Sequence, residues 1–166
     1  LLKHSNANQV VCLAPTQSKL DVLNGYGVDT ILMDRKDPEI HKKAVFERFP
    51  YGVDAIVDAT GSASVLPDCF QLLKKQGRLL QFSSTKDDGN ITINPAYFYR
   101  NELQYYTSYC QVHEFGRAVD AIASGKVRLD KLVTRLYTLE QFPQAIEDVL
   151  DHSVLKLVIR PNGMED

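Results

Sequence analysis

The sequence predicts an α/β fold, a doubly wound parallel sheet, on two observations. Short apolar runs alternate with helix-like stretches through the first hundred residues, and glycines stand where a helix must end before the next strand begins. Apolar runs of this length suit strands buried on both faces, and strands separated by helices pair in parallel. The first four expected strands are residues 10–13, 30–33, 53–57 and 79–82.

The helices follow from apolar residues spaced three and four apart. Pro67 is compatible with a helix only in its first turn, where its missing N–H has no helical acceptor. Additional elements are expected after the doubly wound part. The expected helices span residues 18–26, 38–49, 64–75, 95–101, 112–124 and 141–151, and the remaining strands span residues 91–93, 103–106, 132–136 and 155–159.

Composition indicates a folded domain and excludes two classes of partner. The 166 residues are 44% hydrophobic and 24% charged, close to the averages of globular domains. A net charge of -2 lacks the basic excess of a general nucleic-acid binder. No apolar run approaches the roughly 18 residues of a membrane span. We therefore expect a small-molecule ligand, with neither nucleic acid nor membrane as a partner.

The number and spacing of the cysteines indicate the redox state of the protein's compartment. Cys12, Cys69 and Cys110 are odd in number and widely separated, which predicts neither a disulfide framework nor a metal clip. This favours a reducing, cytoplasmic compartment.

The chain has no initiator methionine, and residues 1–3 resemble the last turn of a helix, so we expect a fragment of a longer protein.

The predicted ligand site lies beyond the carboxyl ends of the strands, where open parallel sheets bind their ligands. The loops at residues 14–19, 58–62 and 83–85 are small and polar. Gly61 would allow close backbone approach, and the hydroxyls of Thr60 and Ser62 would bond either a ribose or the next helix terminus. The same residue types are also typical of ordinary turns and caps, so both interpretations remain open.

A dinucleotide site normally carries G-x-G-x-x-G between its first strand and helix. The sequence has no such run, and residues 25–27 follow a helix instead of a strand. If the chain begins inside the first crossover helix, the glycine loop and the first strand precede Leu1. The strands at residues 10–13 and 53–57 would then flank a gap with unpaired backbone groups, a condition that predicts instability, oligomerisation or another segment in that slot.

The end of the strand at residues 10–13 discriminates between cofactors. An Asp or Glu there binds the adenosine ribose of NAD and repels the 2'-phosphate of NADP. Ala14 occupies this place, and Thr16, Ser18 and Lys19 follow it. Hydroxyls and one cation with no opposing charge favour NADP over NAD. The alternative is that Lys19 is only a solvated helix residue.

No catalytic constellation emerges from the sequence. Neither a metal motif nor a nucleophile elbow is present, and Asp54 and Asp58 lack the partners of an acid/base pair. The four histidines have no ligand spacing and are expected at the surface or in structural roles. They are His4, His41, His113 and His152. We therefore predict binding loops and neither catalytic nor metal-ligating residues.

Taken in order, the segments resemble the cofactor domain of the medium-chain, zinc-dependent alcohol and polyol dehydrogenases, a Rossmann-like fold. The Ala14-Pro15 loop is most similar to the NADP-linked fungal D-arabinitol dehydrogenases. The resemblance covers residues 1–166, as a partial dinucleotide-binding domain with the family's C-terminal segments. It rests on residues 1–15, 27–29, 51–61, 77–80, 93–95, 99–103, 121–127, 132–134 and 155–161.

The resemblance implies roles for individual residues. Ala14 replaces the ribose-binding acid, and Lys19 matches a basic residue of the same loop. The other implied cofactor contacts are Ala59, Thr60 and Gly61 on the adenosine side and Ser83, Ser84, Ser108 and Tyr109 beside the nicotinamide carboxamide. The zinc ligands are implied to lie in an upstream domain outside this chain.

The implied activity is hydride transfer between NADP(H) and a polyol or sugar ketose by a full-length homo-oligomeric enzyme, with this fragment inactive alone. Three alternatives stay open: a zinc-free NADPH quinone or enoyl reductase of the same superfamily, a catalytically silent NADPH-binding structural module, and a methyltransferase of similar layer order, which the missing acid at position 14 disfavours.

Overall fold

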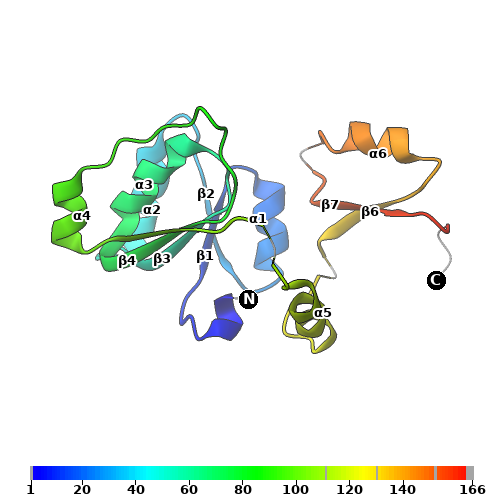
Figure 1. Ribbon diagram of the computed structural model, residues 1–166, viewed down its shortest axis with the longest axis horizontal. Helices are drawn as coiled ribbons and strands as arrows, with labels where there is room; N and C mark the ends of the chain where they lie inside the picture. Colours follow the sequence, from blue (N-terminus) through cyan, green and yellow to red (C-terminus); the bar gives the residue numbers. More distant parts are fainter. Residues whose placement is uncertain (1, 111, 130, 152, 164–166) are drawn as a thin grey trace. The chain divides into compact units, whose positions relative to one another are not determined.

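The computed structural model describes residues 2–110, 112–129, 131–151 and 153–163 (Figure 1). Its chain divides into two compact units, one formed by Leu1–Met33 with His113–Asp166 and the other by Asp34–Val112. Each unit contains parallel strands joined through helices, as the sequence predicts. Within the described ranges, no helix is both long and apolar enough to cross a membrane.

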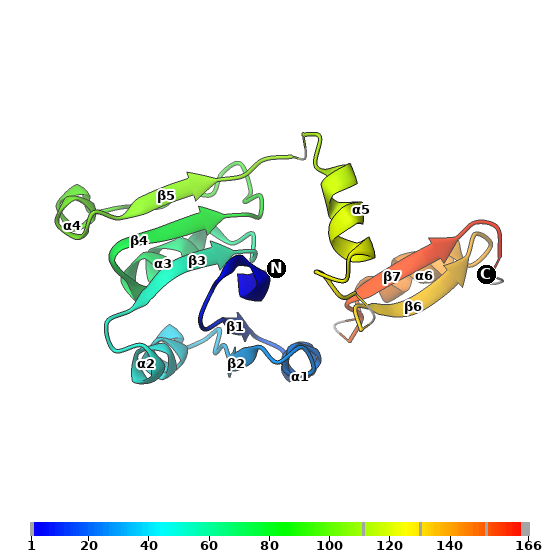
Figure 2. The ribbon, with the colours of Figure 1, turned by 90° about the horizontal axis from the view of Figure 1, so that it is seen from below.

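The unit Asp34–Val112 is built on a three-stranded parallel sheet in the order β3-β4-β5. Figure 2 shows the three strands side by side. Helices α2 and α3 contact each other, and α3 also packs on β3 and β4. The elements are β3 (Val53–Asp58), β4 (Leu73–Gln81), β5 (Gln104–Thr107), α2 (Pro38–Arg48), η2 (Ala63–Val65), α3 (Leu66–Leu72) and α4 (Pro95–Asn101).

Local signals explain where these helices begin. Asp37 caps α2 by accepting a hydrogen bond from the Glu39 N–H at 3.1 Å, and Pro38 follows in the first turn. Asn94 caps α4 in the same way, with Pro95 after it. Pro67 lies in the first turn of α3, which confirms the placement expected from the sequence.

The core of this unit lies between α3 and the sheet. Leu79 of β4 is fully buried, and Phe70 of α3 is 3% exposed. The Phe70 ring meets Phe98 of α4 edge to face at a centroid distance of 4.7 Å, and Tyr105 of β5 at 5.5 Å. These contacts hold α3, α4 and β5 around one aromatic centre.

The other unit contains two parallel strand pairs, β1-β2 and β6-β7. Leu20 of the helix after β1 is 1% exposed, and Ile31 of β2 is 8% exposed. The elements are η1 (Leu2–Ser5), β1 (Val11–Ala14), α1 (Gln17–Asn24), β2 (Asp29–Leu32), α5 (Phe115–Ala123), β6 (Val133–Thr138), α6 (Phe142–Asp148) and β7 (Lys156–Arg160).

Two expected elements differ from the structure. Residues 91–93 form no strand, because Ile91 packs against the α3 core instead of pairing with a neighbouring strand. The third helix was expected to reach residue 75 but ends at Leu72. Leu73, which is 6% exposed, pairs with Val53 and starts β4 directly after the helix. Burial of Leu73 in the sheet overrides the helical pattern of the sequence.

The strands β1 and β3 are both edge strands of their sheets. Among the described residues, the hydrogen-bonded neighbour of β1 is β2, and that of β3 is β4.

Candidate functional site

The loop from β1 into α1 carries the first group of predicted site residues. Ala14 ends β1, and its carbonyl accepts a hydrogen bond from the Met33 N–H at 2.9 Å. Thr16 is the N-cap residue of α1, but its side chain makes no capping hydrogen bond. The first turn of α1 contains no acidic residue. The amino end of this helix therefore keeps its partial positive charge without a carboxylate beside it.

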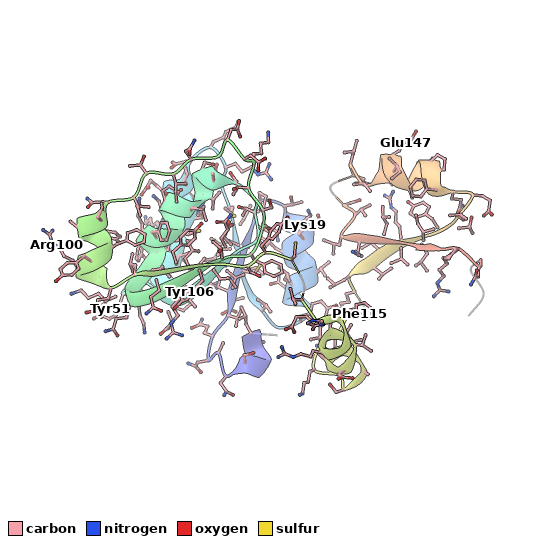
Figure 3. All side chains as sticks on the ribbon, viewed as in Figure 1. Lys19, Tyr51, Arg100, Tyr106, Phe115 and Glu147 are labelled. Carbon is pink, nitrogen blue, oxygen red and sulfur yellow. The ribbon has the colours of Figure 1, made fainter. Side chains whose placement is uncertain are left out.

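Ser18 and Lys19 lie in the first turn of α1, and Figure 3 marks Lys19 on this helix. The Lys19 side chain is half-buried and forms no ion pair with any described residue. Asp21, the acid of α1, accepts a hydrogen bond from Gln17 Nε2 at 2.8 Å. This loop thus presents hydroxyls and an unneutralised ammonium.

The second group of predicted residues lies at the carboxyl edge of the β3-β4-β5 sheet. The Asp58 carbonyl at the end of β3 accepts hydrogen bonds from the N–H groups of Phe82 and Ser83 at 2.8 and 3.3 Å. The Gln81 carbonyl at the end of β4 accepts one from the Ser108 N–H at 3.1 Å. The loops after the three strands therefore start side by side. They hold Ala59, Thr60, Gly61, Ser83, Ser84, Ser108 and Tyr109.

The loops after β3 and β4 are in close contact at Gly61. Its φ of +70° lies in the left-handed region, and a Cβ atom there would be 2.9 Å from the Ser84 carbonyl oxygen. Position 61 therefore requires glycine, both for its positive φ and for its close contact with Ser84. Tyr109, after β5, is 86% exposed. The edge combines close backbone packing with side chains open to solvent.

Hydrogen bonding defines what the Thr60 hydroxyl does. Thr60 Oγ1 donates to Asp58 Oδ1 at 2.7 Å and accepts from the Ser62 N–H at 3.2 Å. A threonine hydroxyl has one proton, so it has none left to donate to a ribose. Ser62 Oγ lies 2.9 Å from Ser64 Oγ in η2. Of the two roles open from sequence, the turn-forming role is the one that these contacts support for Thr60.

Two residues at this edge were not among the predicted site residues. Asp58 is 3% exposed and holds the turn after β3, whereas Asp54 is exposed and pairs with Lys74, so the two acids form no pair. Gln81 accepts from the Tyr105 hydroxyl and donates from Nε2 to the Ser83 carbonyl at 3.1 Å. An Asp followed two positions later by Thr is a turn signal that would have identified Asp58. No sequence signal marks Gln81.

Metal ligands were not predicted in this chain. No group of three His, Cys, Asp or Glu side chains within the described ranges is arranged to hold a metal ion. His41 is 5% exposed on α2, and His113 is exposed. His152 lies outside the described residues. The side chains that the structure describes therefore do not form a zinc site.

The family model described as zinc-binding dehydrogenase matches residues 1–124. The chain belongs to the zinc-binding dehydrogenase family. It is 31% identical over 164 residues to D-arabinitol dehydrogenase 1 of Uromyces fabae, an alignment that covers 98% of this chain and 47% of the relative. The chain thus spans about half the length of that relative.

Solved structures show the same fold. A zinc-binding dehydrogenase of Sinorhizobium meliloti bound to NADP matches with a TM-score of 0.84 and 19% identity, over 96% of this chain and 47% of the other. A short chain alcohol dehydrogenase of E. coli in complex with NADH matches with a TM-score of 0.82 and 18% identity, over 95% and 46%. The chain therefore has the Rossmann-like α/β fold expected from its sequence.

Proposed function

We propose that this chain forms the cofactor-binding part of an oxidoreductase that transfers hydride between NADP(H) and a polyol or sugar ketose related to D-arabinitol. The observation that carries the proposal is Ala14 at the end of β1, in a chain of the zinc-binding dehydrogenase family. A carboxylate at this place would repel a 2'-phosphate, and alanine does not.

The surroundings of Ala14 suit a phosphate. The amino end of α1 has neither an acidic residue nor a side-chain cap to occupy its N–H groups, and Lys19 supplies an ammonium from the same turn. A helix amino terminus with a nearby cation favours an anion. Thr16 and Ser18 add hydroxyl donors. The proposed role of this loop is to bind the 2'-phosphate of NADP.

The proposed role of the β3-β4-β5 edge is to contact the dinucleotide through its loops. The contact between Gly61 and Ser84 supports it, since it brings the loops after β3 and β4 together at this edge. Ser108 and Tyr109 extend the same edge. When bound, the nicotinamide supplies the hydride acceptor or donor. The zinc of the family is proposed to be held by segments outside this chain.

The relatives support the substrate class. D-arabinitol dehydrogenase of Uromyces fabae aligns with almost the whole chain, and D-arabitol-phosphate dehydrogenase of Enterococcus avium aligns with 69% of it at 25% identity. Both names point to five-carbon polyols or their phosphates. We also propose that the full-length protein is a cytoplasmic homo-oligomer.

Competition by cofactor fragments tests the cofactor assignment in the full-length protein. NADPH binding, followed by its fluorescence, should be tighter than NADH binding. The fragment 2',5'-ADP should displace NADPH about tenfold better than 5'-AMP, a difference of about 1.4 kcal/mol. Equal displacement by the two fragments, or preference for NADH, would contradict the proposed role of the β1–α1 loop.

Turnover tests the substrate assignment. The full-length protein with NADP is expected to oxidise D-arabinitol faster than ethanol or a quinol, as measured by NADPH absorbance. Reduction of quinones without polyol oxidation would point to the reductase alternative. NADPH binding without turnover of any of these substrates would point to the structural module.

A further inference from the structure

Asp58 at the end of β3 has a buried carboxylate that a contribution to folding stability does not explain. Its side chain is 3% exposed, and its Oδ2 atom is buried without a hydrogen-bond donor among the described residues. No described Lys, Arg or His forms an ion pair with it. A buried carboxylate without a cation destabilises a fold, and such violations are typical of functional sites.

The other carboxylate oxygen organises the turn after β3. Asp58 Oδ1 accepts hydrogen bonds from the Thr60 N–H at 3.0 Å and from the Thr60 hydroxyl at 2.7 Å. The hydroxyl in turn accepts from the Ser62 N–H at 3.2 Å. These three bonds run in one direction, from Ser62 through Thr60 to the carboxylate. They define the path of the backbone across Gly61.

The main chain of Asp58 organises the loop after β4. Its carbonyl accepts from the N–H groups of Phe82 and Ser83, where the chain leaves β4. Gly61 then meets the Ser84 carbonyl so closely that no Cβ fits between them. One buried residue therefore sets the positions of two loops at the carboxyl edge of the sheet.

We propose that Asp58 is a positioning residue for NADP(H): through its hydrogen bonds to Thr60, it holds the loops after β3 and β4 in the conformation that binds the dinucleotide. This inference rests on the proposed function. Because Asp58 is buried and Thr60 is exposed, Asp58 acts on a ligand through the loop and not by contact.

The alternative is that Asp58 serves only the stability of the unit. The two roles predict opposite effects of Asp58→Val. Valine suits a strand end and removes a buried charge that lacks a cation, so the thermal midpoint should not fall. It also removes Oδ1, the oxygen that accepts both hydrogen bonds from Thr60, so the affinity for NADPH should fall. If Asp58 served stability alone, the thermal midpoint and the affinity for NADPH would change together.

The test uses the full-length protein and NADPH fluorescence to obtain Kd. We expect Asp58→Val and Thr60→Val each to raise Kd about tenfold, equivalent to about 1.4 kcal/mol. Asp58→Asn keeps an acceptor oxygen, and Thr60→Ser keeps the hydroxyl, so both should stay within about twofold of wild type. The double variant Asp58→Val/Thr60→Val should bind NADPH with about the Kd of the weaker single variant, because both substitutions remove the hydrogen bond from the Thr60 hydroxyl to Asp58.

Thr134→Val is a matched control. The Thr134 hydroxyl in β6 donates to the Lys156 carbonyl and accepts from the Leu155 N–H, both at 3.2 Å. Like the Thr60 hydroxyl, it donates one hydrogen bond and accepts one, but it belongs to the other unit. This variant should lower the thermal midpoint and leave Kd unchanged. A Kd that rises equally in Thr134→Val would overturn the inference.

Two further results would also overturn it: wild-type affinity in Thr60→Val, or an additive loss in the double variant. Thr60 is exposed, so its variants remain informative if Asp58→Val does not fold. A wild-type protein that binds neither NADPH nor NADH would instead contradict the proposed function, and the two failures are thereby distinguished.

Discussion

Lys42 Nζ on α2 lies 3.0 Å from Asp68 Oδ1 in the first turn of α3. The Lys42 side chain is only 9% exposed, and Gln71 Oε1 accepts a second hydrogen bond from it at 3.1 Å. A hydrogen bond with Glu39 raises the pKa of Lys42, so the ammonium stays charged where α2 and α3 meet. The contact joins the two helices through a mostly buried charge.

Asp68→Ala should therefore destabilise the protein. The substitution leaves Lys42 with Glu39 and Gln71 but without the carboxylate of α3, and we expect a loss of about 1–3 kcal/mol in the free energy of urea unfolding. Asp54→Ala is the control, because the Asp54–Lys74 pair is exposed, with side-chain exposures of 84% and 44%. That variant should lose less than about 1 kcal/mol. Similar losses in both variants would contradict a structural role for the buried pair.

Ala14→Asp should shift cofactor preference from NADP toward NAD. A carboxylate at the end of β1 repels a 2'-phosphate and accepts hydrogen bonds from ribose hydroxyls. We expect the ratio of kcat/KM for NADP to that for NAD to fall at least about tenfold. Ala123→Asp adds the same charge at the exposed end of α5 and should leave the ratio unchanged. An unchanged ratio in Ala14→Asp would exclude this loop as the 2'-phosphate site.

The three cysteines should differ widely in reactivity. Burial, with the Asp58 and Asp68 carboxylates adding to it, raises the pKa of the Cys69 thiol to about 12. Such a thiol is ionised to roughly one part in ten thousand at pH 8. Burial also raises the pKa of Cys12, whereas Cys110 is exposed. Among these three, iodoacetamide at pH 8 should label Cys110 first and Cys69 only after unfolding, as followed by peptide mass spectrometry. Early labelling of Cys69 would show that α3 opens readily.

Acid should weaken the packing of α6 on β6. Hydrogen bonds lower the pKa of Asp148, mainly from the Tyr137 hydroxyl, and that of Asp151, mainly from Ser153, and Arg135 contacts both acids at 2.8 and 2.5 Å. A lowered folded-state pKa contributes stability that is present above the unfolded-state pKa of about 4 and is lost as pH falls through the folded-state value.

Tyr137→Phe should reduce this pH dependence, since it removes the largest cause of the Asp148 shift. The measurement is the urea midpoint at pH 7 and pH 3 for wild type and variant. Tyr97→Phe is the control, because the Tyr97 hydroxyl donates to the Phe70 carbonyl at 3.5 Å and not to a carboxylate. The prediction fails if Tyr137→Phe and wild type lose the same stability between the two pH values.

Much of the architecture was predictable because its signals are local. The helix α4 at residues 95–101 was expected with the same bounds, since Asn94 and Pro95 define its start by contacts within one turn. The parallel pairing of β3, β4 and β5 follows from helical crossovers between them.

The sequence by itself determined the fold class, the alternation of strands and helices, and the chemical character of the β1–α1 loop, because these depend on neighbouring residues along the chain. Only the tertiary structure decided that α3 ends at Leu72, that Ile91 joins the core, and that Asp58 is buried while Asp54 is exposed. Each of these depends on a partner distant in sequence, such as Val53 for Leu73. Local periodicity carries no information about such partners.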